Sequence, residues 1–449
     1  MPLTLNWQSD GAVACIALVI YAAFVFAASV ALGSKVPGIR RLLPSAILWH
    51  LIVFLFVSLW YFPFYDAMLG GDARGYHDEA ILLAGIMRTG HLEKIGFQLG
   101  AAAVPVITGI LYTPFGGDIY GMLLFCSALS LLSAVIIIKA FAKSCYAVSG
   151  SRYYLCILFM PSIAMWTSAL GKDSIVVFGI ALTAYGVATA FKNRLVRGLL
   201  SLCCGLTLVA AIRIQIALVL IVAAAAAALW PQTGSRRMSS PGMAALLIGM
   251  ISILVPITAR FVGLRELTLA GAVKRQFDIG DLSNYGGSAF GRGSDNDRSL
   301  ARIPIGIWNL LARPYPWEAH NPNVAFAAAE NILIIWLVAC ALGSARHVWS
   351  SVRANRYLLF CAFAAAGLLM ALSMFSNAGT ASRERVQILP FLLAVLLATN
   401  VKRRLPSRIF QRNDVAQWRK SRTSYGFPFN NVGHYDVLNR VLRKGDRRL

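Results

Sequence analysis

The sequence is poor in acidic residues and shows no spacing typical of a disulfide framework or a metal centre. It contains 19 Asp and Glu residues against 42 Lys and Arg, and its 6 histidines are scattered. Nearly all of the 8 cysteines lie in apolar runs, where a thiol packs as a small hydrophobic group. We therefore expect neither a set of disulfides nor a Cys/His metal site.

Two other common signals are missing. No basic segment precedes the first apolar run, so a cleaved signal peptide is not expected. The glycine-rich stretch 286–293 lacks the Gly-Lys-Ser/Thr ending of a phosphate-binding loop, and we interpret it as a flexible loop.

What the chain has in excess is apolar sequence. Of its 449 residues 58% are hydrophobic and the mean hydropathy is +0.65, which excludes a soluble globular protein. Repeated apolar runs predict an all-α polytopic membrane protein with about eleven spans. The run 101–113 is too short to span comfortably, and we expect a re-entrant or interfacial helix there. The expected spans are 11–33, 46–62, 119–138, 153–168, 174–191, 198–213, 214–230, 242–262, 325–345, 357–375 and 386–400.

Basic residues lie mainly in alternate loops and in the tail 401–449, which has only Asp414, Asp436 and Asp446 as acids. Positive charge favours the cytoplasmic side, so we expect the N-terminus outside and the C-terminus in the cytoplasm. The chain then divides into a transmembrane domain, 1–400, with external loops 63–118 and 263–324, and a basic tail that lies on anionic lipid. No feature indicates nucleic acid as a partner, and the richness in Arg, Ala and Leu is typical of a bacterial inner membrane.

The remaining polar residues gather in segments expected on the external side. Ionisable groups near a membrane are costly, and their occurrence in five segments suggests a shared cavity. The alternative is that each group only caps a helix or snorkels at the interface. The 198–213 and 214–230 runs meet at Arg213, which indicates either two half-helices or one long tilted helix. The candidates are Asp72, Tyr76, His77, Asp78 and Glu79; Lys172 and Asp173; Arg213; Arg313, Trp317 and Glu318; and Arg383 with Arg385.

The chain contains three short motifs: Asp72-x-x-x-Tyr76-His77 in the first external loop, Pro161-Ser162-x-x-x-Trp166 leading to Gly171-Lys172-Asp173, and Arg385-x-x-x-Leu389-Pro390 before the last expected span. Together with the expected topology, these motifs resemble the GT-C class of integral membrane glycosyltransferases. The chain departs from that class because it has no clear soluble C-terminal domain. The segment from Arg313 to Glu318 matches no motif of the class.

The resemblance implies transfer of a sugar from a polyprenyl-phosphate carrier to a glycan or lipid acceptor outside the cytoplasmic membrane, in cell-envelope polysaccharide assembly. Asp72 would be the general base, and a single displacement would invert the anomeric centre. The leaving phosphate would be bound by Lys172, Arg213, Arg383 or Arg385. Asp173, or Asp78 with Glu79, could instead hold a divalent metal such as Mg²⁺ or Mn²⁺.

Three other functions stay open. A Wzy-type polysaccharide polymerase is suggested weakly by an arginine and a glycine with ten residues between them, in Arg74 to Gly85 and Arg275 to Gly286. A transporter or lipid-linked-glycan flippase would place charges in discontinuous helices near the middle of the membrane, and Arg213 is the one residue that favours it. A structural membrane subunit would leave the clustered acids unexplained.

Overall fold

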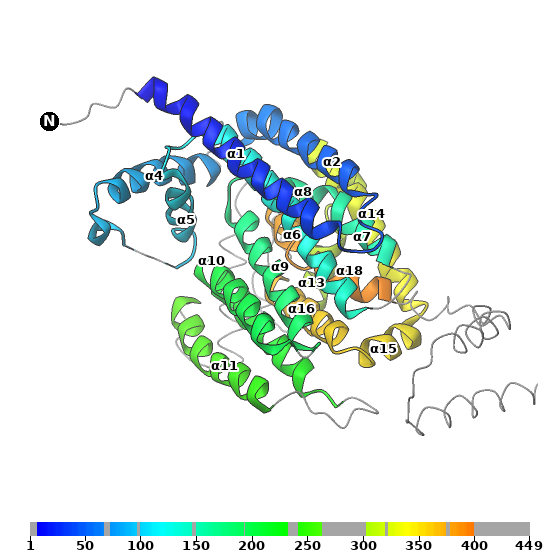
Figure 1. Ribbon diagram of the computed structural model, residues 1–449. Helices are drawn as coiled ribbons and strands as arrows, with labels where there is room; N and C mark the ends of the chain where they lie inside the picture. Colours follow the sequence, from blue (N-terminus) through cyan, green and yellow to red (C-terminus); the bar gives the residue numbers. More distant parts are fainter. Residues whose placement is uncertain are drawn as a thin grey trace, which may run out of the picture. The chain divides into compact units, whose positions relative to one another are not determined.

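The computed structural model describes residues 7–66, 72–96, 99–145, 150–192, 194–231, 241–262, 302–318, 322–373 and 378–398. Every regular element in these ranges is a helix, which confirms the predicted all-α class (Figure 1). The expected tail 401–449 and most of the expected loop 263–324 lie outside the described residues.

The helices follow one another along the chain with short connections. In order they are α1 (Trp7–Gly33), α2 (Leu43–Phe56), η1 (Val57–Asp66), α4 (Asp72–Arg88), η2 (Leu92–Lys94), α5 (Ala103–Tyr112), α6 (Ile119–Ser144), α7 (Gly150–Phe159), α8 (Pro161–Ser168) and α9 (Lys172–Ala190). They continue with α10 (Leu195–Leu229), α11 (Pro241–Val262), α13 (Arg302–Ala312), η3 (Pro316–Glu318), α14 (Pro322–Leu342), α15 (Ala345–Arg353), α16 (Arg356–Leu372), α17 (Ala378–Arg385) and α18 (Leu389–Leu396).

Several of these helices identify a multi-pass membrane protein. Within the described ranges, 6 helices are long and apolar enough to cross a membrane, or up to 7 if the bent pair α15 and α16 counts as one span. The 6 are Gly11–Gly33, Leu43–Pro63, Ile119–Ser144, Lys172–Ala190, Leu195–Leu229 and Val324–Leu342. The expected count of about eleven is therefore not confirmed.

The difference arises where an apolar run is not one continuous long helix. The expected span 153–168 divides at Met160, whose backbone is extended because Pro161 follows and begins α8. The expected span 386–400 contains α18, which has only 8 residues. The two runs that meet at Arg213 form the single element α10. The hydrophobicity of a sequence run depends on composition alone, so it does not reveal where a helix breaks.

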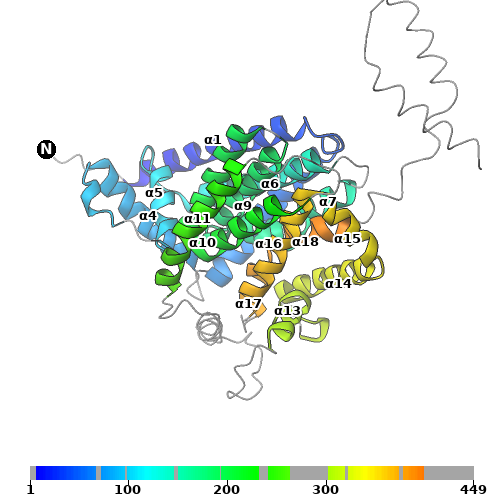
Figure 2. The same cartoon turned by 90° about the horizontal axis from the view of Figure 1, so that it is seen from below.

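Glycines bring α9 and α10 into close contact, and the two helices lie side by side in both views (Figures 1 and 2). A Cβ added to Gly186 would lie 2.5 Å from the backbone nitrogen of Leu202, and one added to Gly198 would lie 2.5 Å from that of Ala190. The two backbones therefore approach as closely as in small-residue interfaces of membrane helices.

The helix α10 changes direction at Arg213, which has the non-helical angles φ −140° and ψ 76°. Before this residue α10 runs along α9, as the glycine contacts show. After it, α10 runs to Leu229, and the ring of the next residue, Trp230, packs against Trp349 in α15 and Phe363 in α16. Arg213 thus separates two helical stretches within one element.

Contacts at the helix termini define two ends of the bundle. Lys143 Nζ near the end of α6 donates to Thr189 Oγ1 near the end of α9 at 2.9 Å. Asn355 Nδ2, which precedes α16, donates to the Ser144 carbonyl at 3.0 Å. The C-terminal ends of α6 and α9 and the start of α16 therefore lie together, and the N-terminal end of α9 lies at the opposite end.

The expected re-entrant or interfacial segment 101–113 contains the short helix α5, whose 10 residues extend about 15 Å. That length is about half of a bilayer's hydrocarbon core. α5 packs on α4, where a Cβ on Gly109 would lie 3.2 Å from the Ala80 carbonyl. Arg88 Nε also donates to the Thr113 carbonyl at 2.6 Å, so α4 and α5 form one helical pair that begins with Asp72.

Candidate functional site

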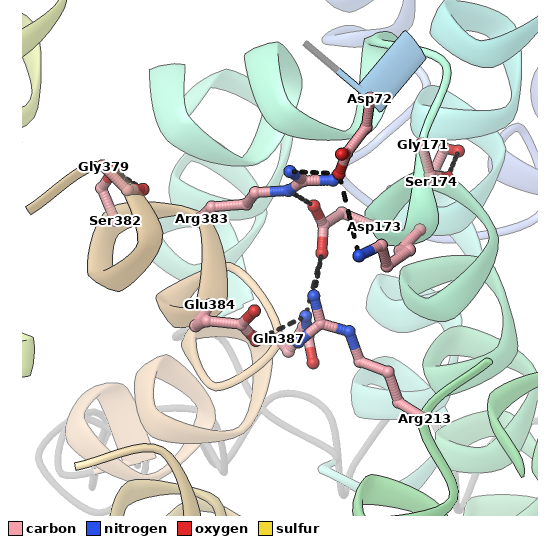
Figure 3. Close-up of polar contacts among 11 residues, drawn as sticks. Asp72, Gly171, Asp173, Ser174, Arg213, Gly379, Ser382, Arg383, Glu384 and Gln387 are labelled. Carbon is pink, nitrogen blue, oxygen red and sulfur yellow. Dashed lines mark hydrogen bonds and ion pairs between the residues drawn. The ribbon is translucent and has the colours of Figure 1, made fainter. Parts of the chain in front are cut away.

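Charged residues from four parts of the chain meet at the N-terminal end of α9 (Figure 3). Asp72 begins α4, Lys172 and Asp173 begin α9, Arg213 lies at the break in α10, and Arg383 and Glu384 lie in the last turn of α17. Gln387 follows in the turn before α18. We call this group the Asp72 cluster: Asp72, Lys172, Asp173, Arg213, Arg383, Glu384 and Gln387.

Asp173 joins the inner part of the cluster, and its side chain is only 1% exposed. Its Oδ2 atom accepts a hydrogen bond from Arg383 Nε. Its Oδ1 atom accepts from Arg213 Nη2 at 3.3 Å and from Gln387 Nε2 at 3.0 Å. Both carboxylate oxygens are therefore occupied, and Asp173 fixes the position of two arginines.

Glu384 provides the second buried carboxylate. Its Oε2 atom accepts hydrogen bonds from Arg213 Nη1 and, at 3.2 Å, from Gln387 Nε2. Two carboxylates thus face two guanidinium groups in the interior, which offsets the cost of removing the charges from water only while every partner is present. In the inner part, the charges of the two carboxylates balance those of the two guanidinium groups, and these contacts fix the side chains in place.

Asp72 forms the outer part, where the cluster reaches the surface. Its side chain is 48% exposed, and its Oδ2 atom lies 3.7 Å from Lys172 Nζ and 3.5 Å from Arg383 Nη1. The side chains of Lys172 and Arg383 are themselves about one quarter exposed, at 27% and 25%. A carboxylate and two cations are therefore accessible together.

Arg383 connects the outer and inner parts. Burial alone would lower the pKa of its guanidinium, but the adjacent carboxylates, first Asp173 and then Asp72, raise that pKa above its ordinary value. The missing side chain of Gly171 leaves room for it, since a Cβ there would lie 3.2 Å from Arg383 Nη2. Arg383 therefore stays charged at the surface of the cluster.

Tyr76 lies one turn along α4 from Asp72 and is buried. Burial raises the pKa of its phenol, the negative charge of Asp72 raises it further, and Arg383 acts in the opposite direction. The hydroxyl therefore stays protonated close to the Asp72 cluster.

Arg385 does not join the cluster, although the sequence grouped it with Arg383. It is fully buried, and its Nη1 atom donates to Asn331 Oδ1 and, at 3.3 Å, to the Leu311 carbonyl. Its Nε and Nη2 atoms have no hydrogen-bond partner among the described residues. Burial lowers the pKa of this guanidinium, and the negative charge of Glu330 opposes that shift.

The other candidates on α4 point away from the cluster or into solvent. His77 Nδ1 forms a hydrogen bond with the Tyr112 hydroxyl at 2.9 Å, which ties α4 to α5. Burial lowers the pKa of the His77 imidazole. Asp78 and Glu79 are exposed.

The segment around Arg313 forms a local structure of its own. Arg313 Nε donates to Glu318 Oε1 at 3.0 Å, and the Tyr315 backbone nitrogen donates to Glu318 Oε2 at 2.9 Å. The Trp317 ring is 80% exposed and stacks on Tyr315 with ring centroids 4.8 Å apart. The contacts described here are all within the turn, from Arg313 to Glu318.

Two residues of the cluster were missed at the level of sequence. Glu384 and Gln387 are not among the candidate residues that the sequence analysis names. Their spacing of three residues places them on one side of a helical turn, which is the signal that could have found them.

The described residues contain no group of three or more His, Cys, Asp or Glu side chains placed to hold a metal ion. The divalent metal expected at Asp173, or at Asp78 with Glu79, therefore stays a prediction. Comparisons with protein-family models, curated proteins and solved structures find no match for this chain.

Proposed function

We propose that the protein is a membrane glycosyltransferase that moves a sugar from a polyprenyl-phosphate carrier to a glycan or lipid acceptor on the external face of a bacterial cytoplasmic membrane. The observation that carries this proposal is the half-exposed Asp72 carboxylate between Lys172 and Arg383. A general base for the acceptor and two cations for the donor phosphate are thus within a few ångströms of one another.

In the proposed reaction, the acceptor hydroxyl attacks the anomeric carbon while Asp72 takes the hydroxyl proton. A new carbon–oxygen bond forms, the bond from the anomeric carbon to the phosphate oxygen breaks, and the phosphate leaves with the electron pair. The sugar configuration inverts because the displacement is direct. Lys172 and Arg383 stabilise the negative charge that develops on the leaving phosphate.

The ion pairs of Asp72 suggest how the donor prepares the base. Its Oδ2 atom faces both Lys172 Nζ, at 3.7 Å, and Arg383 Nη1, at 3.5 Å. The donor phosphate would compete for Lys172 and Arg383 and release Asp72 toward the acceptor. The donor should therefore bind before the acceptor.

Arg213 and Asp173 have a different proposed role from the one expected at the outset. Both are buried, and their charged atoms bind one another, Glu384 and Arg383. We assign them as positioning residues that fix the Arg383 guanidinium in place.

A transporter is the second candidate, and one observation favours it. The helix α10 breaks at Arg213, beside buried carboxylates, as discontinuous helices do in transporters. The position of the cluster at the first turn of α9, at one end of that helix, favours the transferase instead.

Glycan analysis by mass spectrometry tests the proposal in a host that lacks this protein. The host would carry wild type, Asp72→Asn or Asp78→Asn at equal membrane abundance. A transferase predicts that Asp72→Asn resembles the empty host, with a precursor one sugar short, and that Asp78→Asn resembles wild type.

Other outcomes point to the alternatives. Accumulated single repeat units would support a Wzy-type polymerase. Complete lipid-linked glycan retained on the cytoplasmic side would support a flippase. Wild-type glycans with Asp72→Asn would contradict any reaction that depends on this carboxylate.

A further inference from the structure

An exposed pair of stacked aromatic rings lies in the turn that follows α13. The ring of Trp317 stacks on that of Tyr315, with the centroids 4.8 Å apart and an angle of 19° between the planes. The Tyr315 hydroxyl also accepts a hydrogen bond from Trp308 Nε1 at 2.8 Å. We call Trp308, Tyr315 and Trp317 the aromatic platform. Trp317 uses one ring face for Tyr315 and is still 80% exposed, so its other face is open to solvent.

Charged groups lie at the edge of this platform. Arg313 Nε donates to Glu318 Oε1 at 3.0 Å, and the two side chains are 25% and 22% exposed. The Arg313 guanidinium carbon lies 5.6 Å from the centroid of the Tyr315 ring. A flat apolar ring face and a partly exposed pair of hydrogen-bonding groups therefore occur side by side.

The platform lies at the same end of the bundle as the Asp72 cluster. The helix α13 packs against α17, which carries Arg383 of the cluster (Figure 2). Gly306 of α13 meets the carbonyl of Ser373, at the C-terminal end of α16, so closely that a Cβ would not fit. Since the start of α16 contacts the C-terminal end of α6, the end of α16 belongs to the opposite side, where α9 begins.

Buried hydrogen bonds connect the turn of the platform to α17. Asn331 Nδ2 donates to the Pro314 carbonyl at 2.9 Å, and Asn331 Oδ1 accepts from Arg385 Nη1. The same Arg385 atom donates to the Leu311 carbonyl at 3.3 Å. Arg385 follows Arg383 by two residues in α17. The buried Arg385 therefore fixes the turn to the helix that carries a cation of the cluster.

The chemistry of the platform matches that of a sugar ring. A pyranose has a face of C–H groups, which packs on an aromatic face because both are flat and apolar. Its edge carries hydroxyl groups, to which a guanidinium can donate and from which a carboxylate can accept. A lipid tail has no flat face, and hydrocarbon around the Arg313–Glu318 pair would remove its water at high cost. The platform therefore fits a carbohydrate better than the interior of a bilayer.

We propose that the aromatic platform binds a glycan, one sugar ring of which lies on the open face of Trp317 with its hydroxyl groups on Arg313 and Glu318. That this glycan is the acceptor rests on the proposed transferase function. The inference then selects a glycan over a lipid as the class of acceptor.

Fluorine NMR of the full chain in lipid nanodiscs, with its 10 tryptophans replaced by 5-fluorotryptophan, tests this site. The probe is the pool of oligosaccharides that mild acid releases from the envelope of the organism that makes this protein. Trp336 is the internal control, because it is 56% exposed but lies in the apolar helix α14. Trp317→Phe and Trp336→Phe identify the two signals. We expect the oligosaccharides to shift the Trp317 signal and not that of Trp336, and no shift at Trp317 would overturn the proposal.

A spin label on the acyl chain of phosphatidylcholine tests the membrane as the alternative occupant. It should broaden the signal of Trp336 and leave that of Trp317 sharp. Equal broadening of the two signals would overturn the glycan site in favour of a membrane anchor.

Variants measure the contribution of the ring. Trp317→Ala should raise the half-saturating concentration of one oligosaccharide fraction about tenfold, because the stacking face is lost. Trp317→Phe keeps a flat ring and should restore most of the binding, and Trp336→Ala should bind like wild type. Equal binding by wild type and by a Trp317→Ala variant that elutes like wild type would contradict the platform.

Kinetics separate this inference from the proposed function. The titrations contain no sugar donor, so they do not depend on catalysis. Glycan binding at Trp317 without any sugar transfer would support the platform and contradict the transferase, and transfer without such binding would do the reverse. If both hold, Trp317→Ala should raise KM for the acceptor about tenfold and leave kcat and KM for the donor unchanged.

Discussion

Replacing Asp173 with asparagine tests whether the buried ion pairs support the fold around the cluster. The change preserves shape but removes the charge that faces Arg213 and Arg383, and the site is only 1% exposed. Removing one partner of a buried ion pair costs about 3–5 kcal/mol, because the other charge stays buried without compensation. In the Asp173→Asn variant, Arg213 would still pair with Glu384, and Arg383 would still pair with the exposed Asp72. We therefore expect the free energy of unfolding to fall by the lower value, about 3 kcal/mol.

The measurement is the free energy of unfolding in mixed micelles of a mild and a denaturing detergent. Ser174→Ala is the matched control, because Ser174 is the next buried residue and donates one neutral hydrogen bond, to the Gly171 carbonyl at 2.8 Å. The free energy of unfolding of Ser174→Ala should fall by about 1 kcal/mol. Asp173→Asn combined with Arg383→Gln should lose less than the sum of the single variants. A loss for Asp173→Asn no larger than that of the control would refute a charge-dependent support.

Two further predictions concern helix contacts and pH. Gly186→Ala should destabilise the protein by about 1–3 kcal/mol, because the new Cβ would lie 2.5 Å from the backbone nitrogen of Leu202. Gly85→Ala, whose Cβ would meet open space on α4, should stabilise the protein by about 0.5–1 kcal/mol. Unfolding curves of the two variants that shift in the same direction would contradict this prediction. Burial lowers the pKa of His77 below its ordinary 6.5, so the unfolded chain takes up the proton first. Stability should be full above about pH 6.5 and fall at lower pH, and His77→Gln should remove that part of the decrease in pH-dependent unfolding.

The helical membrane character could be predicted because it depends on composition. The number of spans was harder to predict, because counting apolar runs ignores local breaks such as the one that Pro161 causes after Met160 and the one at Arg213. The Arg213 break separates two stretches that are equally apolar, and only the charged side chain between them marks the position.

Five of the seven residues of the Asp72 cluster can be found from the sequence for a simple physical reason. Charges are rare in an apolar chain, so Asp72, Lys172, Asp173, Arg213 and Arg383 were conspicuous in the sequence, and the structure places them in mutual contact. Which arginine faces which carboxylate was not predictable from their positions in the sequence.

The contrast between Arg383 and Arg385 shows what helical geometry adds. Residues two positions apart in a helix lie about 200° apart around its axis, so Arg383 and Arg385 cannot face the same side. Arg383 accordingly contacts Asp72 and Asp173, while Arg385 contacts Asn331 on the other side of α17. Grouping the two by sequence proximity overlooked this separation.

The most direct test of the central claim is sugar transfer by purified protein, with a polyprenyl-phosphate sugar as donor. Asp72→Asn and Asp78→Asn make the same change on the same helix, but only Asp72 contacts Lys172 and Arg383. We expect Asp72→Asn to lower the transfer rate by at least about 100-fold, which is the effect of losing a general base. The free energy of unfolding of this variant should stay within about 1 kcal/mol of the wild-type value, because Asp72 is half exposed. Asp78→Asn should transfer normally, and equal rates for the two variants would contradict the assignment of Asp72 as the base.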